Sequence, residues 1–258
     1  MDKSTLTGII LAVVGILAGL VLEGGRLGQI LQPTAAMIVI GGTIGAVMVQ
    51  FPLPTVLRAG KSLSQVFVEK ANGSDKLVKT LVDFAQKARK EGIVSLDADL
   101  PNIQEGFLKK SLMLAVDGTE PEELRKMMEI DLDVVAEDEE KISQVFEAAG
   151  GFAPTIGIIG AILGLIQVMQ HLENIDEVGK GIAVAFVATI YGVGSANVFF
   201  LPAAGKLKIR HRKEQLLREM AVEGVVSILE GINPRMLETK LRGFFADQPG
   251  RSPEAAKS

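Results

Sequence analysis

The chain offers few side chains that could do covalent or metal chemistry. It has no cysteine, which excludes a disulfide framework, a thiol nucleophile and a cysteine metal site. Its two histidines, His171 and His211, lie far apart and lack the spacing of metal ligands. No Ser/His/Asp set or catalytic carboxylate pair stands out, and the glycine-rich pieces do not form a phosphate-binding loop. We therefore expect a protein that is not an enzyme, with no metal and no cofactor.

The most notable polar groups lie within two apolar segments, Gly151 to Gln170 and Gly181 to Pro202. They are Thr155, Gln167, Gln170, Thr189, Tyr191, Ser195 and Asn197. Hydroxyl groups can bond the carbonyls of their own helix, which favours a role in packing. Alternatively, these groups line an ion path whose ionisable group another chain supplies, because neither segment contains Asp, Glu, Lys or Arg. The residues by themselves leave both interpretations open.

The elements that must position these groups are membrane-spanning helices. Each segment has about the ~20 apolar residues that a helix needs to cross ~30 Å of hydrocarbon. Each is also rich in small residues, which let helix backbones approach closely. Two more apolar runs, Leu6 to Leu22 and Thr34 to Val49, predict a second hairpin near the N-terminus. The first run could also be a signal peptide, but it has no clear cleavage site, so we predict four spans.

Between the hairpins, the spacing of apolar residues predicts a compact helical domain. Helices are expected over residues 75–89, 104–116 and 121–149, with Gly92 ending the first and SLDADLPN forming a turn. The fold class is therefore all-α: an integral membrane protein with four transmembrane helices and a helical cytoplasmic domain. The expected division is 1–54 for spans one and two, 55–150 for the cytoplasmic domain, 151–204 for spans three and four, and 205–258 for a C-terminal helix and tail.

Positive charge is placed very unevenly along the chain. Of the 27 Lys and Arg residues, only Lys3, Arg26 and Lys180 lie outside residues 55–150 and 205–258. Lys and Arg are retained on the cytoplasmic side, above all near the ends of spans. Both termini and the long middle segment should therefore be cytoplasmic. The basic cluster after the fourth span also suits a flank that contacts anionic membrane lipids, and no nucleic-acid motif appears.

Three longer motifs resemble one family, the MotA/PomA flagellar stator subunits of the wider MotA/TolQ/ExbB proton-channel group. They are KARKEGIVSLD at 87–97, FAPTIGIIGAILGLI at 152–166 and ATIYGVGSANVFFLPAAGKLK at 188–208. The resemblance covers nearly the whole chain and implies a multi-pass protein of the bacterial inner membrane. It further implies a homopentamer around a dimer of a one-span, MotB-like partner that carries the essential proton-binding Asp. Proton flow would turn the pentamer, which would push on the switch-complex protein of the rotor's cytoplasmic ring.

The resemblance also implies roles for individual polar residues. Arg89 and Asp97 match the charged torque residues that meet the rotor, although Asp97 replaces the Glu more usual there. Lys90 is the adjacent basic candidate. On the residues alone, all three could equally be surface charges of little energetic weight. Thr189 matches the threonine that faces the partner's Asp, and Thr155 lies near the same pore surface.

Two prolines and two alanines carry further expectations. Pro154 and Pro202 match family prolines near the cytoplasmic ends of spans three and four, which shape the ion-coupled conformational change. On the residues alone, Pro154 could simply start a helix, whereas Pro202 should bend or end one. Sodium-driven relatives, as the resemblance suggests, place threonines where this chain has Ala161 and Ala188. Because sodium prefers several oxygen ligands, the resemblance implies a proton motor.

Other functions fit parts of the sequence. The nearest is a TolQ/ExbB-type subunit that energises an envelope or transport machine, but those relatives have three spans and an outside N-terminus. The first hairpin and KARKEGIVSLD favour the stator. A membrane scaffold without ion work would tolerate Thr189→Val and Pro154→Ala. A solute transporter would show an internal repeat or a pair of broken helices, and neither is apparent.

Overall fold

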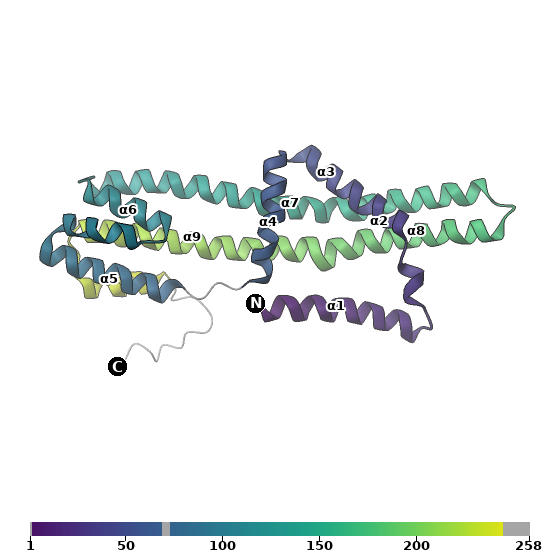
Figure 1. Ribbon diagram of the computed structural model, residues 1–258, viewed down its shortest axis with the longest axis horizontal. Helices are drawn as coiled ribbons and strands as arrows, with labels where there is room; N and C mark the ends of the chain where they lie inside the picture. The colour runs from purple at the N-terminus through teal and green to yellow at the C-terminus, as the bar shows by residue number, and fades with distance from the viewer. Residues whose placement is uncertain (1, 69–72, 245–258) are drawn as a thin grey trace. The chain divides into compact units, whose positions relative to one another are not determined.

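The computed structural model describes residues 2–68 and 73–244, and every regular element within these ranges is helical (Figure 1). The elements are α1 (Lys3–Leu22), η1 (Leu27–Ile30), α2 (Pro33–Ala36), η2 (Met37–Gly41), α3 (Gly42–Gln50), α4 (Leu53–Phe67), α5 (Gly73–Glu91), η3 (Ile93–Asn102), α6 (Gly106–Val116), α7 (Pro121–Gln170), α8 (Ile175–Ser195), η4 (Ala196–Phe200), α9 (Leu201–Leu229) and α10 (Pro234–Gly243). The predicted all-α class is confirmed.

The chain divides into two compact units, each built from two stretches of sequence. The first unit lies within Met1–Glu69 and Asp138–Arg210, and the second lies within Lys70–Glu137 and His211–Ser258. The long helices α7 and α9 contribute residues to both units. The first unit also includes α4, although the charge pattern assigns residues 55–150 to one cytoplasmic segment.

Four helical runs are long and apolar enough to cross a membrane, as the sequence predicts. They are α1, the run Pro33–Gln50, α7, and the run Ile175–Leu229. No side chain of α1 is buried, and Leu11 is 75% exposed. An apolar surface of this extent suits hydrocarbon as its solvent rather than water.

Span three lies inside one long helix and span four continues into α9, which corrects the expectation that Pro154 starts a helix and the alternative that Pro202 ends one. Pro154 does not start a helix but lies inside the 50-residue α7. Pro202 does not end one either, because the chain stays helical from α8 through η4 to the end of α9. The turn η4 is π-helical and directly precedes Pro202. Local π turns and packing against neighbouring helices re-satisfy the backbone groups that a proline leaves without partners.

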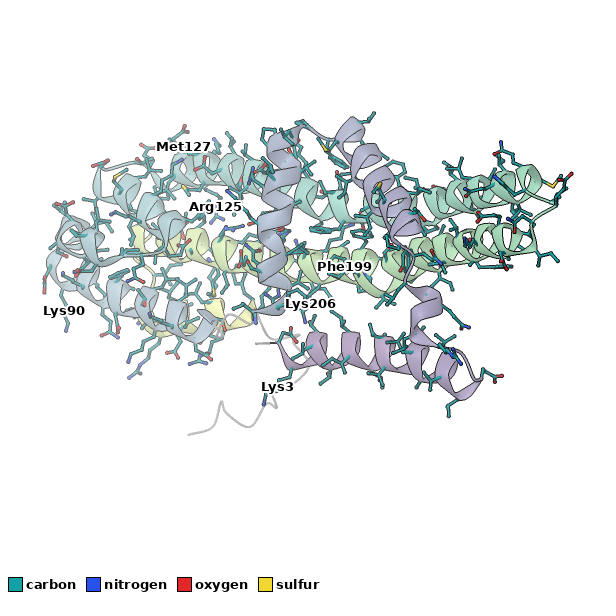
Figure 2. All side chains as sticks on the ribbon, turned by 45° about the vertical axis from the view of Figure 1, so that its right-hand side comes forward. Lys3, Lys90, Arg125, Met127, Phe199 and Lys206 are labelled. Carbon is teal, nitrogen blue, oxygen red and sulfur yellow. The ribbon has the colours of Figure 1, made fainter. Side chains whose placement is uncertain are left out.

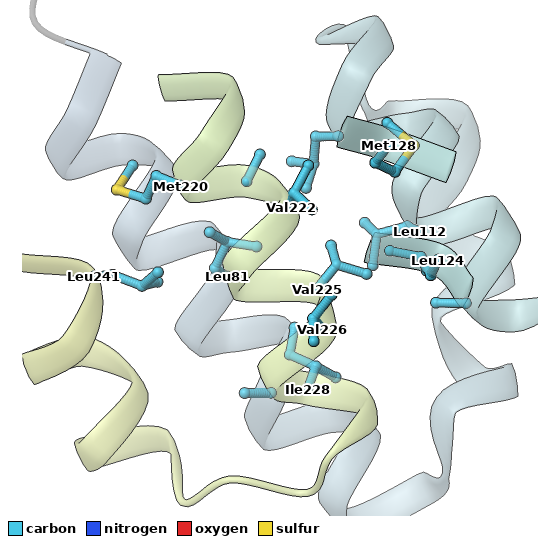
Figure 3. Packing of buried hydrophobic residues seen from close by; sticks show 14 of the residues in the cluster. Leu81, Leu112, Leu124, Met128, Met220, Val222, Val225, Val226, Ile228 and Leu241 are labelled. Carbon is cyan, nitrogen blue, oxygen red and sulfur yellow. The ribbon is translucent and has the colours of Figure 1, made fainter. Parts of the chain in front are cut away.

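The second unit has its own hydrophobic core, to which α5, η3, α6, α10 and parts of α7 and α9 contribute (Figure 3). Leu81, Leu112, Leu124 and Val225 are fully buried in this core. The predicted helices over residues 75–89 and 104–116 are present as α5 and α6. This unit therefore folds around side chains that the helical spacing already places on one face of each helix.

The link between α5 and α6 differs in part from its prediction. Gly92 does end α5, with a φ of +84° that glycine adopts readily and other residues do not. The segment predicted as a turn is instead the 3-10 helix η3, in which Leu96 and Leu100 are buried. Burial of these two leucines stabilises a regular element where Asp, Pro and Asn indicate a loop.

Candidate functional site

Spans three and four meet along small residues, which together we call the glycine seam. It consists of Gly157, Gly160 and Gly164 on α7 and of Gly181, Ala185, Ala188 and Gly192 on α8, two helices that run side by side (Figure 1). A Cβ atom at Gly192 would lie 2.5 Å from the carbonyl oxygen of Ala153. A Cβ atom at Gly164 would lie 2.7 Å from the carbonyl oxygen of Gly181. The two backbones therefore touch, which only glycine permits at these positions.

The two candidate pore threonines both bond their own helix. The Thr155 hydroxyl donates to the Phe152 carbonyl at 2.8 Å, and the Thr189 hydroxyl donates to the Ala185 carbonyl at 3.2 Å. Thr155 is exposed and Thr189 is half-buried. Because a hydroxyl group keeps two acceptor lone pairs after donating its proton, both oxygens can still bind a proton donor or a cation.

Ala188 and Ala161 have different surroundings. Ala188 is fully buried in a small cluster with Ala35, Val39 and Val187, whereas Ala161 is half-buried. A Cβ atom at Gly160 would lie 2.7 Å from the Ala188 Cβ, so the seam closes over this methyl group. A threonine at 188 would have to place two extra heavy atoms, Oγ1 and Cγ2, in this closed position. Ala188 is therefore fitted to the helix packing, whatever its part in ion selection.

The two prolines that match prolines of the family lie in different surroundings. Pro154 lies at one end of the glycine seam, where a Cβ atom at Gly192 would come within 3.2 Å of its Cα. Pro202 is exposed and lines a cavity beside α1, together with Phe199 and Lys206. Both prolines thus lie where spans three and four contact other helices, but the structure does not bring them together in one site.

Tyr191 connects the two hairpins and was not singled out by the sequence beyond its polarity. Its hydroxyl group donates to the carbonyl of Ile30 at 2.5 Å and accepts from the Gln32 N–H at 3.3 Å. Both partners belong to the segment that joins the first two spans. Tyr191 is the only tyrosine in the sequence. This was the one feature of the sequence that could have indicated a special role for it.

Replacing this hydroxyl group should loosen the first hairpin. In Tyr191→Phe the Ile30 carbonyl and the Gln32 N–H lose a partner, which costs about 1–3 kcal/mol for partly buried groups. We expect a lower thermal midpoint for the purified chain in detergent. Phe186→Leu, at a side chain that is 69% exposed on the same helix, is the control and should change little. Equal thermal midpoints for Tyr191→Phe and the wild type would show that the two hydrogen bonds of the Tyr191 hydroxyl group do not contribute to stability.

The three candidate rotor-facing residues gather where α5 meets η3. Arg89 and Lys90 lie in the last turn of α5, where positive charge suits the helix dipole, and Asp97 lies on η3. All three are exposed, and Lys90 points outward (Figure 2). In the part of the chain that the structure describes, none of the three forms an ion pair, whereas the neighbouring Lys87 and Asp99 pair at 2.7 Å. The three charges are thus available to a partner.

A carboxylate inside the second unit joins three helices. Glu223 of α9 accepts from Arg125 of α7 at 2.7 Å and also pairs with Lys240 of α10. Burial opposes ionisation of Glu223, but the hydrogen bonds from Arg125 and Lys240 outweigh it, and its pKa is lowered. Sequence reasoning missed this cluster because Arg125 and Glu223 are 98 positions apart and no local pattern connects them.

A second cluster, also missed, ties the start of α1 to two other helices of the first unit. Asp2 caps α1 by accepting from the Thr5 N–H at 3.2 Å, and its own N–H donates to the Phe67 carbonyl at 2.8 Å. Its carboxylate pairs with Lys206 and, at 3.5 Å, with Arg210. The hydrogen bond from Lys206, against the opposing effect of burial, lowers the pKa of Asp2 to about 2. The lone acid ahead of the first span was the available signal.

Comparisons with known proteins agree with this architecture. The model of the MotA/TolQ/ExbB proton channel family matches residues 99–220, and that of the motility protein A N-terminal region matches residues 6–92. Motility protein A of Bacillus subtilis is 38% identical over 93% of this chain and 90% of its own length. Chemotaxis protein PomA of Vibrio alginolyticus is 32% identical, with 95% of this chain and 96% of its own length covered.

Two solved stator complexes have the same fold. The structure of C. jejuni MotAB matches with a TM-score of 0.90 and 33% identity, covering 98% of this chain and 100% of that chain. The flagellar MotAB stator complex of Bacillus subtilis matches with a TM-score of 0.85 and 37% identity, covering 95% of this chain and 100% of that chain.

Together the four candidate spans and the glycine seam define a multi-pass, helical membrane protein. The chain belongs to the motility protein A (MotA/PomA) family of flagellar stator subunits, within the MotA/TolQ/ExbB proton channel group. This is a family of channel subunits and not a known class of enzymes. The match of residues 6–92 to the motility protein A model places the first apolar run within the family's own N-terminal region, which disfavours the signal-peptide interpretation.

Proposed function

We propose that this chain is a flagellar motor stator subunit that couples proton flow across the inner membrane to torque on the rotor. The observation that carries the proposal is the likeness to two solved MotAB complexes along nearly the whole chain. We propose a MotB-like, one-span partner whose essential Asp binds the proton, and a homopentamer of this chain around a dimer of that partner. Both termini lie in the cytoplasm, consistent with the distribution of Lys and Arg.

Within this proposal the spans and the second unit have separate tasks. Thr189 and Thr155 face the ion path and the partner, next to the glycine seam that holds spans three and four together. Pro154 and Pro202 shape the movement that ion transfer drives. Arg89, Lys90 and Asp97 contact the switch-complex protein of the rotor, supported by their exposure at the end of α5 and on the adjoining η3. The transported ion is the proton, and no cofactor is required.

Deletion of the gene tests the function. Flagellated but paralysed cells, rescued by the gene together with that of its one-span partner, are the expected result. Normal swimming with a leaky envelope or lost uptake of scarce nutrients would instead favour the TolQ/ExbB-type alternative. Normal swimming without either defect calls for deletion of any second stator set, and a double mutant that still swims would overturn the proposal.

Ion choice gives a second expected outcome. Motor speed in cells that depend on this stator should fall when a protonophore collapses the proton gradient and should not follow external sodium. The reason is that Ala161 and Ala188 supply no oxygen ligands, whereas protonation of a carboxylate needs no cage of ligands. Tethered-cell rotation measures the speed. Rotation that tracks sodium and ignores the protonophore would show the ion assignment to be wrong.

Reversing the charge of Arg89 on α5 or of Asp97 on η3 gives a third expected outcome. Arg89→Glu and Asp97→Lys should each reduce swimming strongly, and a matching charge reversal on the rotor protein should partly restore it. Both side chains are exposed, so the membrane level of the chain should not change. Lys76→Glu, also on α5, is a control for charge alone. A loss of protein from the membrane in either variant would assign the residue to folding rather than to torque.

A further inference from the structure

The first unit contains a cavity to which the proposed function assigns no ligand, although Pro202 is part of its wall. It has a volume of about 370 Å³ and lies between α1, the end of α4, η4 and the start of α9. Most of its wall is apolar, with Val66 and Phe67 on one side and Val198 and Phe199 on another. On α1 the wall is formed by Ile9 and by four smaller residues, Gly8 and Ala12 among them, which leave the space open.

One end of this cavity is cationic. Lys206 lines it, and Lys206 and Arg210 both pair with the single carboxylate of Asp2. Lys208, in between on α9, has its own partner in Glu147 at 2.7 Å. Among the described residues, two cations therefore share one anion, and the cluster keeps one positive charge that no carboxylate balances. Lys206 and Phe199 lie on the helical run that passes the start of α1 (Figure 2).

The surroundings limit what can occupy the cavity. Apart from Val66 and Phe67 of α4, its walls belong to the first and fourth spans, so a molecule from the bilayer can reach it. A flexible hydrocarbon chain fits a narrow space of this size. The unbalanced positive charge at one end favours an occupant with an anionic headgroup.

We propose that this cavity binds one acyl chain of an anionic glycerophospholipid, with the phosphate against Lys206 and Arg210. The bound lipid fills the space between α1 and the turn η4 and balances the charge that Asp2 leaves over. This site rests on the membrane spans and not on motor function, so it can fail while the stator assignment stands. In this proposal the basic flank of the fourth span binds one lipid molecule at a defined site, rather than making only a general contact with membrane lipids.

Native mass spectrometry of the full chain, purified with its one-span partner, tests the site. After delipidation, phosphatidylglycerol or phosphatidylcholine is added and the lipid retained per chain is counted. The wild type should retain phosphatidylglycerol over phosphatidylcholine by about fivefold, the factor expected of one basic side chain near an anionic headgroup. Ala12→Phe, which fills the cavity, should lose this retention. Ala18→Phe, at an exposed position of α1 outside the cavity, should keep it.

Charge variants keep the test decisive if Ala12→Phe does not fold. Lys206→Gln should lose the preference for phosphatidylglycerol while Lys206→Arg restores it. Equal retention of both lipids by the wild type, or full retention by Ala12→Phe, would overturn the proposal. Occupation by a second copy is tested separately with Gly8→Cys carrying a thiol-linked photo-crosslinker, since the chain has no other cysteine. Crosslinking of this position to a neighbouring copy would assign the cavity to that subunit and also overturn the proposal.

Discussion

Gly192→Ala should disrupt the packing of spans three and four, whereas Gly194→Ala, two residues further along the same run, should be close to neutral. A Cβ atom at Gly192 would lie 2.5 Å from the Ala153 carbonyl oxygen, and that oxygen belongs to rigid backbone. At Gly194 nothing lies within 4 Å of the added atom. To relieve the overlap the helices must move apart, and overpacking of this kind costs about 1–3 kcal/mol.

Two measurements distinguish these variants. The thermal midpoint of the purified chain reports the packing directly, and swimming speed reports whether the proposed ion path beside the glycine seam survives. Both variants replace glycine by alanine in a helix and gain the same helix propensity, so their difference isolates the contact. Equal thermal midpoints for Gly192→Ala and Gly194→Ala would mean that the glycine seam accommodates the added methyl group without loss of stability. The close approach would then not explain the small residues in these spans.

The sequence was a sound guide to the spans because hydropathy and length depend on local composition. Residues 151–170 and 181–202 contain no charged side chain, and neither do the first two apolar runs, Leu6 to Leu22 and Thr34 to Val49. The same local logic placed α5 and α6 and the glycine that ends α5. The small residues of spans three and four indicated close packing, and the glycine seam is that packing.

The conformational preferences of proline gave a wrong prediction where tertiary contacts determine the backbone conformation. Pro154 would start a helix in water, but inside α7 it packs against Gly192 of the neighbouring span, which holds the turn in place. The same applies to Asp97, whose segment looks like a loop until Leu96 and Leu100 are buried beside it. In both cases the energy that settles the local structure comes from residues distant in the sequence.

The polar contacts could not be predicted for the same reason. Asp2 and Lys206 lie far apart in the sequence, and the charge pattern indicates a role for Lys206 only as part of the basic flank of the fourth span. Their pairing depends on α1 returning to the start of α9. Arg89 and Asp97 are the opposite case, because their exposure agrees with both a rotor contact and a plain surface charge. Only the charge-reversal experiment separates those two interpretations.

Glu223→Gln should destabilise the second unit by about 2 kcal/mol at neutral pH, the size expected for hydrogen bonds to charged groups. The substitution keeps the side-chain shape but leaves Arg125 and Lys240 without their shared carboxylate. Removing one partner of a fully buried pair costs more, about 3–5 kcal/mol. Here the Arg125 and Lys240 side chains are 38% and 43% exposed, so water compensates part of the loss.

The pH dependence of this effect has a definite sign. The pKa of Glu223 in the folded chain lies below its ordinary value of 4.5, so the charged cluster contributes its full stability above that value. As pH falls through the lowered pKa, the carboxyl group is protonated and the contribution is lost. The difference between the wild type and Glu223→Gln in chemical unfolding should therefore be large at pH 7 and should shrink in acid.

A matched control separates the effect of losing a buried carboxylate from the effect of changing the net charge by one. Glu238→Gln removes one carboxylate from α10, where Glu238 pairs with Arg242 on an exposed face. Such a pair is worth about 0.3–0.5 kcal/mol, so this variant should unfold almost as the wild type does. If both variants lost the same stability, the loss would follow net charge and not the junction of α7, α9 and α10. If only Glu223→Gln unfolds early, that junction is what holds the candidate rotor-facing unit together.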